Sequence, residues 1–484
     1  MTKLADASLA SLPASVAVPK FDRHRLLPGI VHIGVGNFHR VHQAVVIGAL
    51  LEEPGNEAWG ICGVGILDGE AAQSKAAAFK AQDCLYTVTE FAADGSAIVA
   101  VVTSMIDYLH APSDPEAVLA RLASPQTHIV SLTITEGGYD AGKAMAEAGQ
   151  PGSPRSAFDY IVEGLDRRRR AQLPPFTVMS CDNLRSNGDS ARAVTLALAN
   201  GRDPALASWI DRHGAFPNSM VDRIAPRVSE EERLSLNARS GIDDALPAIC
   251  ETYTNWVMED RFCDGRPPFE RAGVSLRDDV AAFVAVKGRL SNAAHMLLCY
   301  PALLLGYRLV NVAMQDARLE KLLRDFWTLD AIPLVTPPPG FSPQAFTNQV
   351  VERFANLGIN DQLLRVAHDG VSKILVFHAK NIADLIAAGK PLDRIAFMFA
   401  CFAHYLRGHD DASRPFPVDE PRLGAADWAL LESADPLAVL KLAPFAELRL
   451  MESAAFRDAY AAAASALAGK GTSSVLTGLV GSAP

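Results

Sequence analysis

Residues 29–43 read Gly-Ile-Val-His-Ile-Gly-Val-Gly-Asn-Phe-His-Arg-Val-His-Gln, and this stretch decides the fold class. Residues 29–33 predict a short buried strand, and the apolar residues that follow the turn, as far as Leu51, predict a helix. A strand, a glycine turn and a helix in this order are typical of a mononucleotide-binding unit. Gly34 would permit the tight turn, and Gly36 would let the backbone approach a pyrophosphate at the helix N-terminus.

The glycine pair needs its context to carry weight. A lone Gly-x-Gly is weak evidence, but its position between a predicted strand and a predicted helix strengthens it. The third glycine of the usual fingerprint is replaced by His39. We expect Gly34, Gly36, Asn37 and Phe38 to form a turn that binds a dinucleotide.

A second strand is predicted at residues 60–66, with Asp68 just beyond its end. An acid at this place can accept hydrogen bonds from the adenosine ribose and repel a 2′-phosphate, which predicts NAD as the cofactor rather than NADP. The alternative is that Asp68 caps the helix predicted over residues 70–80.

Two further buried strands are predicted at residues 128–134 and 176–180. In an open parallel sheet, ligands bind beyond the carboxyl ends of the strands. We therefore expect Thr135 and Glu136, after the first of these strands, and Asn183, after the second, to lie near the cofactor.

The remaining segments define two domains. Residues 85–91 and 97–103 flank Asp94-Gly95 and predict a hairpin, whereas residues 1–28 are expected to be an irregular lead-in. From about Asp278 onward, long segments with apolar residues at helical spacing follow one another. We predict an α/β Rossmann-like domain at residues 1–278 and a mostly α-helical domain at residues 279–484, with a frayed tail from Gly469.

The first of these helical segments carries unusual polar residues. Residues 286–298 read Val-Lys-Gly-Arg-Leu-Ser-Asn-Ala-Ala-His-Met-Leu-Leu and predict one continuous helix. At about 100° per residue, Ser291, His295 and Asn292 fall roughly 40°, 80° and 140° around the axis from Lys287. This arc could simply face water, but it lacks the Glu and additional Lys of an ordinary solvated face, which indicates a chemical role.

Composition excludes several classes of protein. A net charge of −10, with 49% hydrophobic and 21% charged residues, argues against nucleic acid or an anionic membrane as the main partner. The one basic run, residues 167–170, is expected to be a solvated helix face. Seven scattered cysteines without a Cys-x2-Cys pair, no signal sequence and no long apolar run predict a reduced cytoplasmic protein.

Alcohol oxidation with NAD requires a base for the hydroxyl proton. His and Cys do not occur at zinc-ligand spacings, so no metal is expected, and no Tyr-x3-Lys pair presents itself. A lysine whose pKa is lowered toward roughly 7–8 by desolvation is the remaining choice, and Lys287 has apolar flanks. Asn292, on the same helix, and Asn183, at a strand end, could donate hydrogen bonds to the alkoxide.

The Lys-x4-Asn-x2-His spacing from Lys287 to His295 resembles a signature of the mannitol dehydrogenase family, the polyol-specific long-chain dehydrogenases and reductases. The Gly-x-Gly-x-Phe-His-Arg variant at residues 34–40 resembles that family too, and the similarity extends from Gly29 to about Gly370. The resemblance implies Lys287 as the general base, Asn183 and Asn292 as oxyanion donors, and His295 as the partner of a substrate hydroxyl.

The same resemblance implies that Asp222, Arg365 and Lys373 bind other hydroxyls of a polyol. Each assignment has a plainer alternative. His295 could be a core histidine, Asp222 could pair with a nearby arginine, and Arg365 and Lys373 could be surface charges.

The chain departs from the family pattern at three places. Val284 stands where relatives often have an acid, one turn before the lysine, and Gly137 follows Glu136 where some have a lysine. Residues 374–380 read Ile-Leu-Val-Phe-His-Ala-Lys in place of the usual prolines. These changes lie beside the expected substrate and proton route.

The leading hypothesis is an NAD-dependent enzyme that interconverts a C5 or C6 sugar alcohol and its ketose, of the mannitol and fructose type. A hexuronate reductase of the fructuronate type is the alternative, and Arg365, Lys373 and Lys380 could serve its carboxylate. A third hypothesis is an inactive NAD(H)-binding sensor. The expected partner is a polyol or ketose, with no nucleic acid and no membrane, and the chain could act as a monomer.

Overall fold

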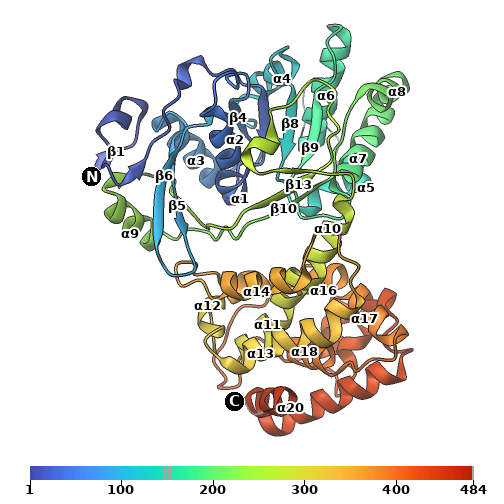
Figure 1. Cartoon of the computed structure of the whole chain (residues 1–484). Coiled ribbons are helices and arrows are strands. Elements are labelled where there is room, and N and C mark those ends of the chain that lie inside the picture. The colour runs from blue at the N-terminus through green and yellow to red at the C-terminus, as the bar shows by residue number, and fades with distance from the viewer. Residues whose placement is uncertain (147–148, 150–154, 482–484) are drawn as a thin grey trace. The chain divides into compact units, whose positions relative to one another are not determined.

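The computed structural model describes residues 1–146, 149 and 155–481, which fall into two compact units, Met1–Ala281 and Ala282–Pro484 (Figure 1). Within the described residues, every β-strand belongs to the first unit, and the second unit is built from helices. The predicted fold class is confirmed.

The first unit is organised on a parallel sheet of five strands in the order β7-β4-β3-β8-β9. The strands are β3 (Ile30–Ile33), β4 (Ile61–Gly65), β7 (Met105–His110), β8 (Ile129–Leu132) and β9 (Thr177–Ser180). The strand predicted from residues 29–33 is therefore central, with β4 on one side and β8 on the other.

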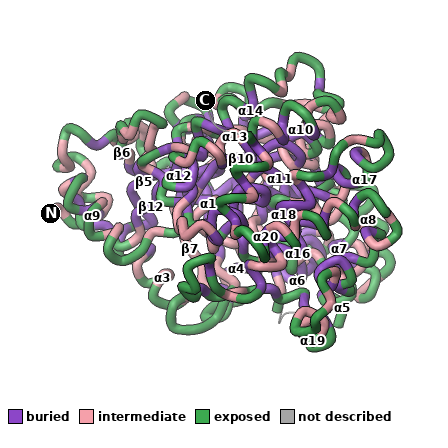
Figure 2. Tube along the Cα trace, turned by 90° about the horizontal axis from the view of Figure 1, so that it is seen from below, coloured by how far each residue is buried: buried purple, intermediate pink, exposed green. Residues whose placement is uncertain are grey.

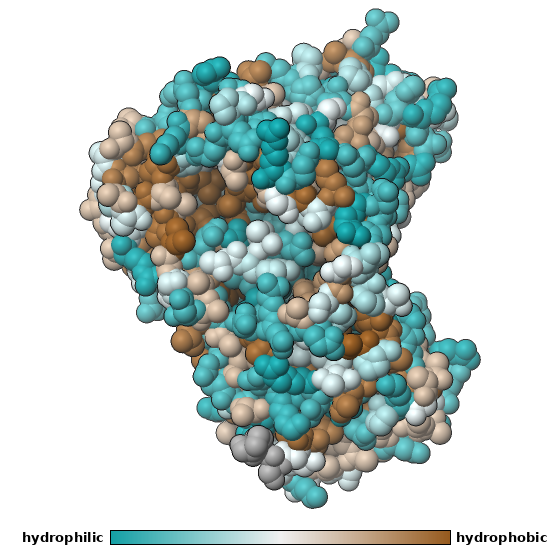
Figure 3. Space-filling view, in the orientation of Figure 1, coloured by the Kyte–Doolittle hydropathy of each residue, from teal (hydrophilic) through white to brown (hydrophobic). Residues whose placement is uncertain are grey.

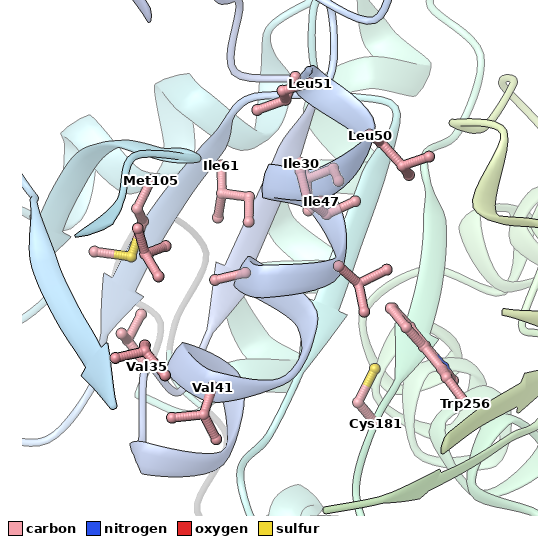
Figure 4. Packing of buried hydrophobic residues seen from close by; sticks show 14 of the residues in the cluster. Ile30, Val35, Val41, Ile47, Leu50, Leu51, Ile61, Met105, Cys181 and Trp256 are labelled. Atoms are coloured by element: carbon pink, nitrogen blue, oxygen red, sulfur yellow. The ribbon is translucent and has the colours of Figure 1, made fainter. Parts of the chain in front are cut away.

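Helices cover both faces of this sheet. Successive residues of a strand point to opposite faces, and here both faces carry apolar side chains that must be buried. Ile30 and Ile61 belong to the core that includes residues of α1 and α2, whereas Val31 and Cys62 join the core made with α4, α6, α7 and α8. Figure 4 shows the first of these cores around α2. The helices of the unit are α1 (Asn37–Val41), α2 (Gln43–Leu51), α3 (Glu70–Ala81), α4 (Pro115–Ala123), α5 (Ala141–Ala146), α6 (Ala157–Arg170), α7 (Asn187–Arg202), α8 (Pro204–His213) and α9 (Glu230–Ser240).

Smaller sheets surround the parallel one. They contain β5 (Tyr86–Phe91), β6 (Ala97–Val102), β12 (Ala248–Glu251) and β2 (Val16–Ala17) in one sheet, β10 (Ser219–Asp222), β13 (Asn255–Met258) and β14 (Ser275–Leu276) in another, and β1 (Thr2–Lys3) with β11 (Ile242–Asp243) in a third. The predicted hairpin is confirmed by antiparallel pairing of β5 with β6. The prediction of an irregular lead-in is wrong, because β1 pairs with β11 and β2 with β6.

The second unit packs around α11, which contacts α13, α15, α16 and α18. Figure 2 shows α11 and α18 mostly in the colour of buried residues. The helices are α10 (Val280–Lys287), which begins at the end of the first unit, α11 (Ala293–Leu304), α12 (Val310–Ala313), α13 (Ala317–Asp325), α14 (Pro343–Phe354), α15 (Leu363–Ala367), α16 (Gly370–Phe377), α17 (Ala379–Ala387), α18 (Asp393–Tyr405), α19 (Ala425–Leu431) and α20 (Ala454–Val480).

Two predictions for the second unit require correction. Residues 286–298 are not one continuous α-helix, since a π-helical turn, η5 (Gly288–Asn292), separates α10 from α11. The tail from Gly469 is helical as far as Val480, with a kink at Gly471 where φ is +72°. Thr472, fully buried, anchors it through hydrogen bonds from its amide and hydroxyl to Asp411.

The basic run of residues 167–170 is not uniformly solvated. The side chain of Arg168 is fully buried, and its guanidinium donates to the carbonyls of Ser124, Thr127 and Pro174 over 2.6–2.8 Å. It also pairs with Asp264 at 3.3 Å. Arg168 therefore satisfies three loop carbonyls, which a view of the run as a charged helix face misses.

The face seen in Figure 3 is largely hydrophilic, with hydrophobic patches on both units. Within the described residues, each helix is too short or too polar to cross a bilayer.

Candidate active site

The glycine turn after β3 has the geometry that its sequence requires. Gly34 adopts φ +97°, and a Cβ atom there would lie 2.2 Å from the carbonyl oxygen of Thr133. Only glycine fits without a shift of the backbone. A Cβ at Gly36 would meet nothing closer than the Gly34 carbonyl at 3.8 Å, so the backbone is open to a ligand there.

His39 replaces the third glycine of the fingerprint by packing against the strand. Its ring stacks on that of His32 in β3, with centroids 3.5 Å apart and planes 9° from parallel. His32 is held between the hydroxyls of Ser131 and Thr133, at 2.8 and 2.9 Å. Burial lowers the pKa of His32 to about 3, so the stack is neutral at physiological pH and fixes α1 on the sheet.

Asn37 and Phe38 are held by neighbours in the first unit. The Asn37 amide donates to the carbonyl of Pro226 and accepts from Arg40, at 3.0 and 2.7 Å, while the Phe38 ring stacks on His42. These contacts fix the first turn of α1, whose backbone would face a pyrophosphate.

Lys75, on α3, is a basic residue at this turn that the sequence analysis missed. Its ammonium donates to the carbonyl of Val35, between the two glycines. Burial, together with the positive charge of Arg40, lowers its pKa to about 8. Within the described residues no carboxylate pairs with Lys75, so an anion bound at the turn would supply the missing countercharge. In the sequence, nothing distinguishes Lys75 from Lys80, the other lysine of this alanine-rich helix.

Asp68 lies three residues beyond β4 and is exposed. Its carboxylate accepts a hydrogen bond of 2.7 Å from the amide of Gly69, the N-cap residue of α3. No basic side chain of the described residues pairs with it, and the carboxylate faces solvent at the strand end. The prediction that this acid contacts a ribose is compatible with that placement.

The ends of β8 and β9 are joined by Asp182, which the sequence analysis also missed. Its buried carboxylate accepts hydrogen bonds from the amides of Ile134 and Thr135 and from the Tyr139 hydroxyl, at 2.7–3.0 Å. Burial raises the pKa of Asp182, and these donors oppose that shift. Thr135 takes up φ +68°, a strained value for threonine that these bonds offset.

The two predicted ligand contacts beside this link, Glu136 and Asn183, are both exposed. Glu136 begins the short 3-10 helix η3 (Glu136–Tyr139), and Asn183 follows Asp182 directly. Asp182 therefore connects both loops at the carboxyl edge of the parallel sheet, where ligands bind.

Asp222 is the last residue of β10 and is buried, opposite Asn255 of β13. The neighbouring Arg223 forms an ion pair of 2.6 Å with Glu90 and donates to the carbonyls of Glu251 and Val41. The charge of Arg223 is thus directed to Glu90.

In the second unit, Lys287 and Asn292 stand at the two ends of the π turn η5. The amide of Ala293 bonds to the carbonyl of Gly288, five residues back instead of four. The extra residue in the turn reduces the rotation per residue, so Asn292 lies closer to Lys287 around the axis than the 140° of a regular helix. Lys287 and Asn292 are both partly buried, whereas Val286, Leu290 and Leu297 are buried.

His295 and Arg365 share a buried acid, Asp361. The His295 ring stacks on Phe354 at 3.8 Å, with planes 4° apart. Asp361, with a side chain 2% exposed, accepts two hydrogen bonds of 2.6 Å from Arg365. Burial alone would raise the pKa of Asp361, but Arg365 and His295 hold it below the ordinary value.

Lys373 completes this group on α16. Its ammonium donates to the carbonyls of Val366 and Arg365, at 2.8 and 3.3 Å. Burial and the charge of Arg365 lower its pKa. The structure therefore brings His295 and Arg365 together at Asp361, with Lys373 beside Arg365. The i,i+4 spacing of Asp361 and Arg365 is the sequence signal that could have identified the acid.

In the parts of the chain that the structure describes, no group of three or more His, Cys, Asp or Glu side chains is arranged to hold a metal ion.

Family models match both units. Residues 28–271 match the mannitol dehydrogenase Rossmann domain, and residues 279–467 match the mannitol dehydrogenase C-terminal domain. The chain belongs to the mannitol dehydrogenase family. The resemblance inferred from the sequence motifs is confirmed.

Individual members of the mannitol dehydrogenase family are similar over nearly the whole chain. A polyol:NADP oxidoreductase of Gluconobacter oxydans (strain 621H) is 45% identical over 449 residues, covering 90% of this chain and 92% of that protein. A mannitol 2-dehydrogenase of Phaeosphaeria nodorum (strain SN15 / ATCC MYA-4574 / FGSC 10173) is 39% identical over 455 residues, covering 91% of this chain and 79% of that protein.

Two solved structures of similar proteins span both domains. A D-sorbitol dehydrogenase in substrate-free form aligns with a TM-score of 0.88 and 41% identity, over 98% of this chain and 100% of that one. Pseudomonas fluorescens mannitol 2-dehydrogenase, in a ternary complex with NAD and D-mannitol, aligns with a TM-score of 0.90 and 36% identity, over 99% of each chain.

Proposed function

We propose that this chain is a polyol dehydrogenase that oxidises a secondary alcohol of a C5 or C6 sugar alcohol to the ketose and catalyses the reverse reduction. The observation that carries the proposal is the π turn between Lys287 and Asn292, which draws a basic and an amide side chain toward one side of a helix. The names of similar family members support the substrate class. Mannitol and fructose are the first pair to test.

The proposed cofactor-binding residues lie in residues 1–278, and most of the proposed catalytic and substrate-binding residues lie in residues 279–484. NAD, when bound, would accept the hydride from the carbinol carbon. Lys287 removes the hydroxyl proton, and the amides of Asn183 and Asn292 donate hydrogen bonds to the developing alkoxide. The remaining hydroxyls of the polyol are held by four side chains: His295, Asp222, Arg365 and Lys373.

The residues at the glycine turn fit a dinucleotide. Gly34 and Gly36 leave the backbone accessible, and Lys75 provides an uncompensated positive charge beside it. Asp68 supports NAD over NADP, because an unpaired carboxylate at the ribose would repel a 2′-phosphate. The Gluconobacter relative is named for NADP, so the preference needs direct measurement.

A uronate reductase is the second candidate in the same reaction class. A carboxylate substrate calls for an uncompensated cation, but Arg365 is neutralised by Asp361, and Lys380 pairs with Asp384. Lys373 donates to two carbonyls and remains the candidate cation for a substrate carboxylate. The pairing of Arg365 and Lys380 with acids favours a neutral polyol over a uronate.

The location that we propose is the cytoplasm. All seven cysteines are free thiols, and six of them are buried. Such a chain is typical of a reducing compartment.

The function is tested by assaying the purified chain on a panel of C5 and C6 polyols and ketoses and on a panel of hexuronates, each with NAD(H) and NADP(H). We expect turnover of a polyol–ketose pair with NAD(H). Turnover of uronates alone would replace the proposal with the reductase. Tight NADH binding without turnover of any compound would indicate a sensor.

A further inference from the structure

The π turn η5 stands where ordinary helix bonding is interrupted. A π turn breaks the regular pattern of bonds to the fourth residue, and such turns persist where other groups stabilise them. η5 packs against α14, α16 and the second π-helical segment, η6 (Phe326–Ala331). Two side chains donate hydrogen bonds to backbone carbonyls here, one within η5 and one directly after it.

Trp327, in η6, provides the first donor. Its indole N–H donates to the carbonyl of Leu290, in the middle of the π turn, at 2.7 Å. The side chain is one of the largest fully enclosed ones in the chain, and the residue is only 2% exposed. The indole has a single donor, and in this buried place it bonds to the Leu290 carbonyl, so the bond fixes the position of that carbonyl.

His378 provides the second donor, at the break between α16 and α17. Its Nε2 lies 3.0 Å from the carbonyl of Ala293, the first residue after the turn. Burial lowers the pKa of His378 to about 4, so the ring is neutral at physiological pH. Because a carbonyl can only accept, Nε2 must carry the single ring proton.

Arg289 fixes the turn from its own side. This buried residue donates from Nε to the Asn381 side chain at 2.7 Å and from Nη1 to the Leu334 carbonyl at 3.0 Å. Its guanidinium also pairs with Asp384 at 2.9 Å. Arg289 therefore ties the π turn to α17, on elements that carry none of the proposed catalytic groups.

We propose that Trp327 and His378 are positioning residues that hold η5 in its π-helical form and thereby set the orientation of Lys287 relative to Asn292. The inference rests on the proposed function, since it assigns these two residues to the proposed base and oxyanion donor. Neither Trp327 nor His378 needs to touch the substrate. If a donor is lost, the turn relaxes toward α-helical bonding and rotates Asn292 away from Lys287.

The test uses two substitutions that remove a donor and two that preserve the bonding. Trp327→Phe deletes the indole N–H, and its matched control is Trp256→Phe, since Trp256 is equally buried but its N–H has no hydrogen-bond partner among the described residues. His378→Leu deletes the donor to Ala293, whereas the amide of His378→Gln can donate from a place similar to Nε2. Each variant is measured for kcat, KM, the pH profile of kcat, NADH binding and Tm.

We expect Trp327→Phe and His378→Leu to lower kcat by about 10²-fold, the scale of a small misplacement of reacting groups. The apparent pKa on the acidic side of the kcat profile should shift, and NADH affinity should stay at the wild-type value. Trp256→Phe and His378→Gln should keep kcat within about threefold of wild type, well above the loss in the donor-deleting variants.

Unchanged kcat and pH profile in Trp327→Phe and His378→Leu would overturn the inference, and so would an equal loss in His378→Gln and His378→Leu. If Trp327→Phe fails to fold, the His378 pair alone decides. Failure of the proposed function is distinguishable, because the wild type would then turn over no polyol or ketose.

Discussion

The guanidinium of Arg365 and the carboxylate of Asp361, four residues apart, face each other through two hydrogen bonds of 2.6 Å. The acid is buried and the arginine is about half exposed, so the pair presents an oriented arginine whose charge is already balanced. Charge-assisted, bidentate geometry of this kind fixes direction more firmly than a single bond.

Asp361→Asn should therefore weaken polyol binding. The asparagine cannot accept two bonds from the guanidinium, and we expect the KM for the polyol to rise about tenfold, equivalent to roughly 1.4 kcal/mol. Glu452→Gln, which loses an exposed pair with Arg449, is the control and should leave KM unchanged. An unaltered KM in Asp361→Asn would remove Arg365 from the substrate site.

The same pair should contribute to acid sensitivity. The folded pKa of Asp361 lies below its unfolded value of about 3.9, so its stabilisation is present above that pH and is lost as pH falls through the folded pKa. Scans of Tm between about pH 3 and 7 should show a smaller acid-induced decrease in Asp361→Asn than in wild type.

Lys287→Ala should remove the base and leave the fold intact, because alanine is favourable in a helix. NADH binding should persist, since the cofactor turn belongs to the first unit. Oxidation should fall by several powers of ten and lose the ionisation of Lys287 from its pH profile, and an added primary amine should restore part of it. Lys321→Ala, on α13, is the control; full turnover of Lys287→Ala with an unchanged profile would refute the lysine mechanism.

Asn183→Ala and Asn292→Ala should each lower kcat by about 10²-fold or more, with small effects on NADH affinity. Each loses a donor that acts when charge develops on the substrate oxygen. Asn348→Ala, an exposed asparagine on α14, should behave as wild type. Either active-site variant with normal kcat would show that its amide is structural.

Asp68→Ser should weaken NAD use and relax discrimination against NADP, since the unpaired carboxylate would no longer repel a 2′-phosphate. The ratio of kcat/KM for the two cofactors is the measurement. Glu70→Gln, an exposed acid two residues further on, controls for net charge. If the ratio does not change, Asp68 is not at the ribose.

Lys75 should make cofactor binding depend on pH. With a pKa of about 8, its ammonium loses its proton as pH rises through that value, and NADH affinity should fall in the same range because a bound pyrophosphate favours the charged form. Lys75→Met should bind more weakly and without this dependence, whereas Lys80→Met, exposed on the same helix, should retain it. A flat affinity profile in the wild type would contradict a phosphate contact.

Local features of the fold could be predicted from the sequence. The strand before Gly34, the turn itself and the hairpin of β5 with β6 depend on residues close in sequence, whose pattern determines their conformation. The helical positions of Lys287 and His295 were accessible for the same reason.

Features that depend on distant residues could not be predicted. The hydrogen-bond donors at η5 are Trp327 and His378, which lie 37 and 85 residues from the carbonyls they bind. The sequence analysis assumed a constant rotation of 100° per residue, and the angle that it predicted for Asn292 was therefore wrong. The burial of Arg168 could not be predicted from the basic run, because the loop carbonyls that it binds lie about 40 residues earlier in the chain. Asp182 had no periodic pattern to mark it.

The π turn also constrains how the length of the chain can change. It contains one residue more than an α-helical turn of the same rise, so removal of Gly288 would let bonds to the fourth residue run from Val280 as far as Tyr300, before Pro301. Lys287 and Asn292 would then stand four residues apart in a regular helix, about 40° around the axis, instead of five residues apart across the π turn. Insertions and deletions are tolerated in most surface loops of such a protein, but between residues 287 and 292 a single one would change the angle between the proposed base and its amide partner.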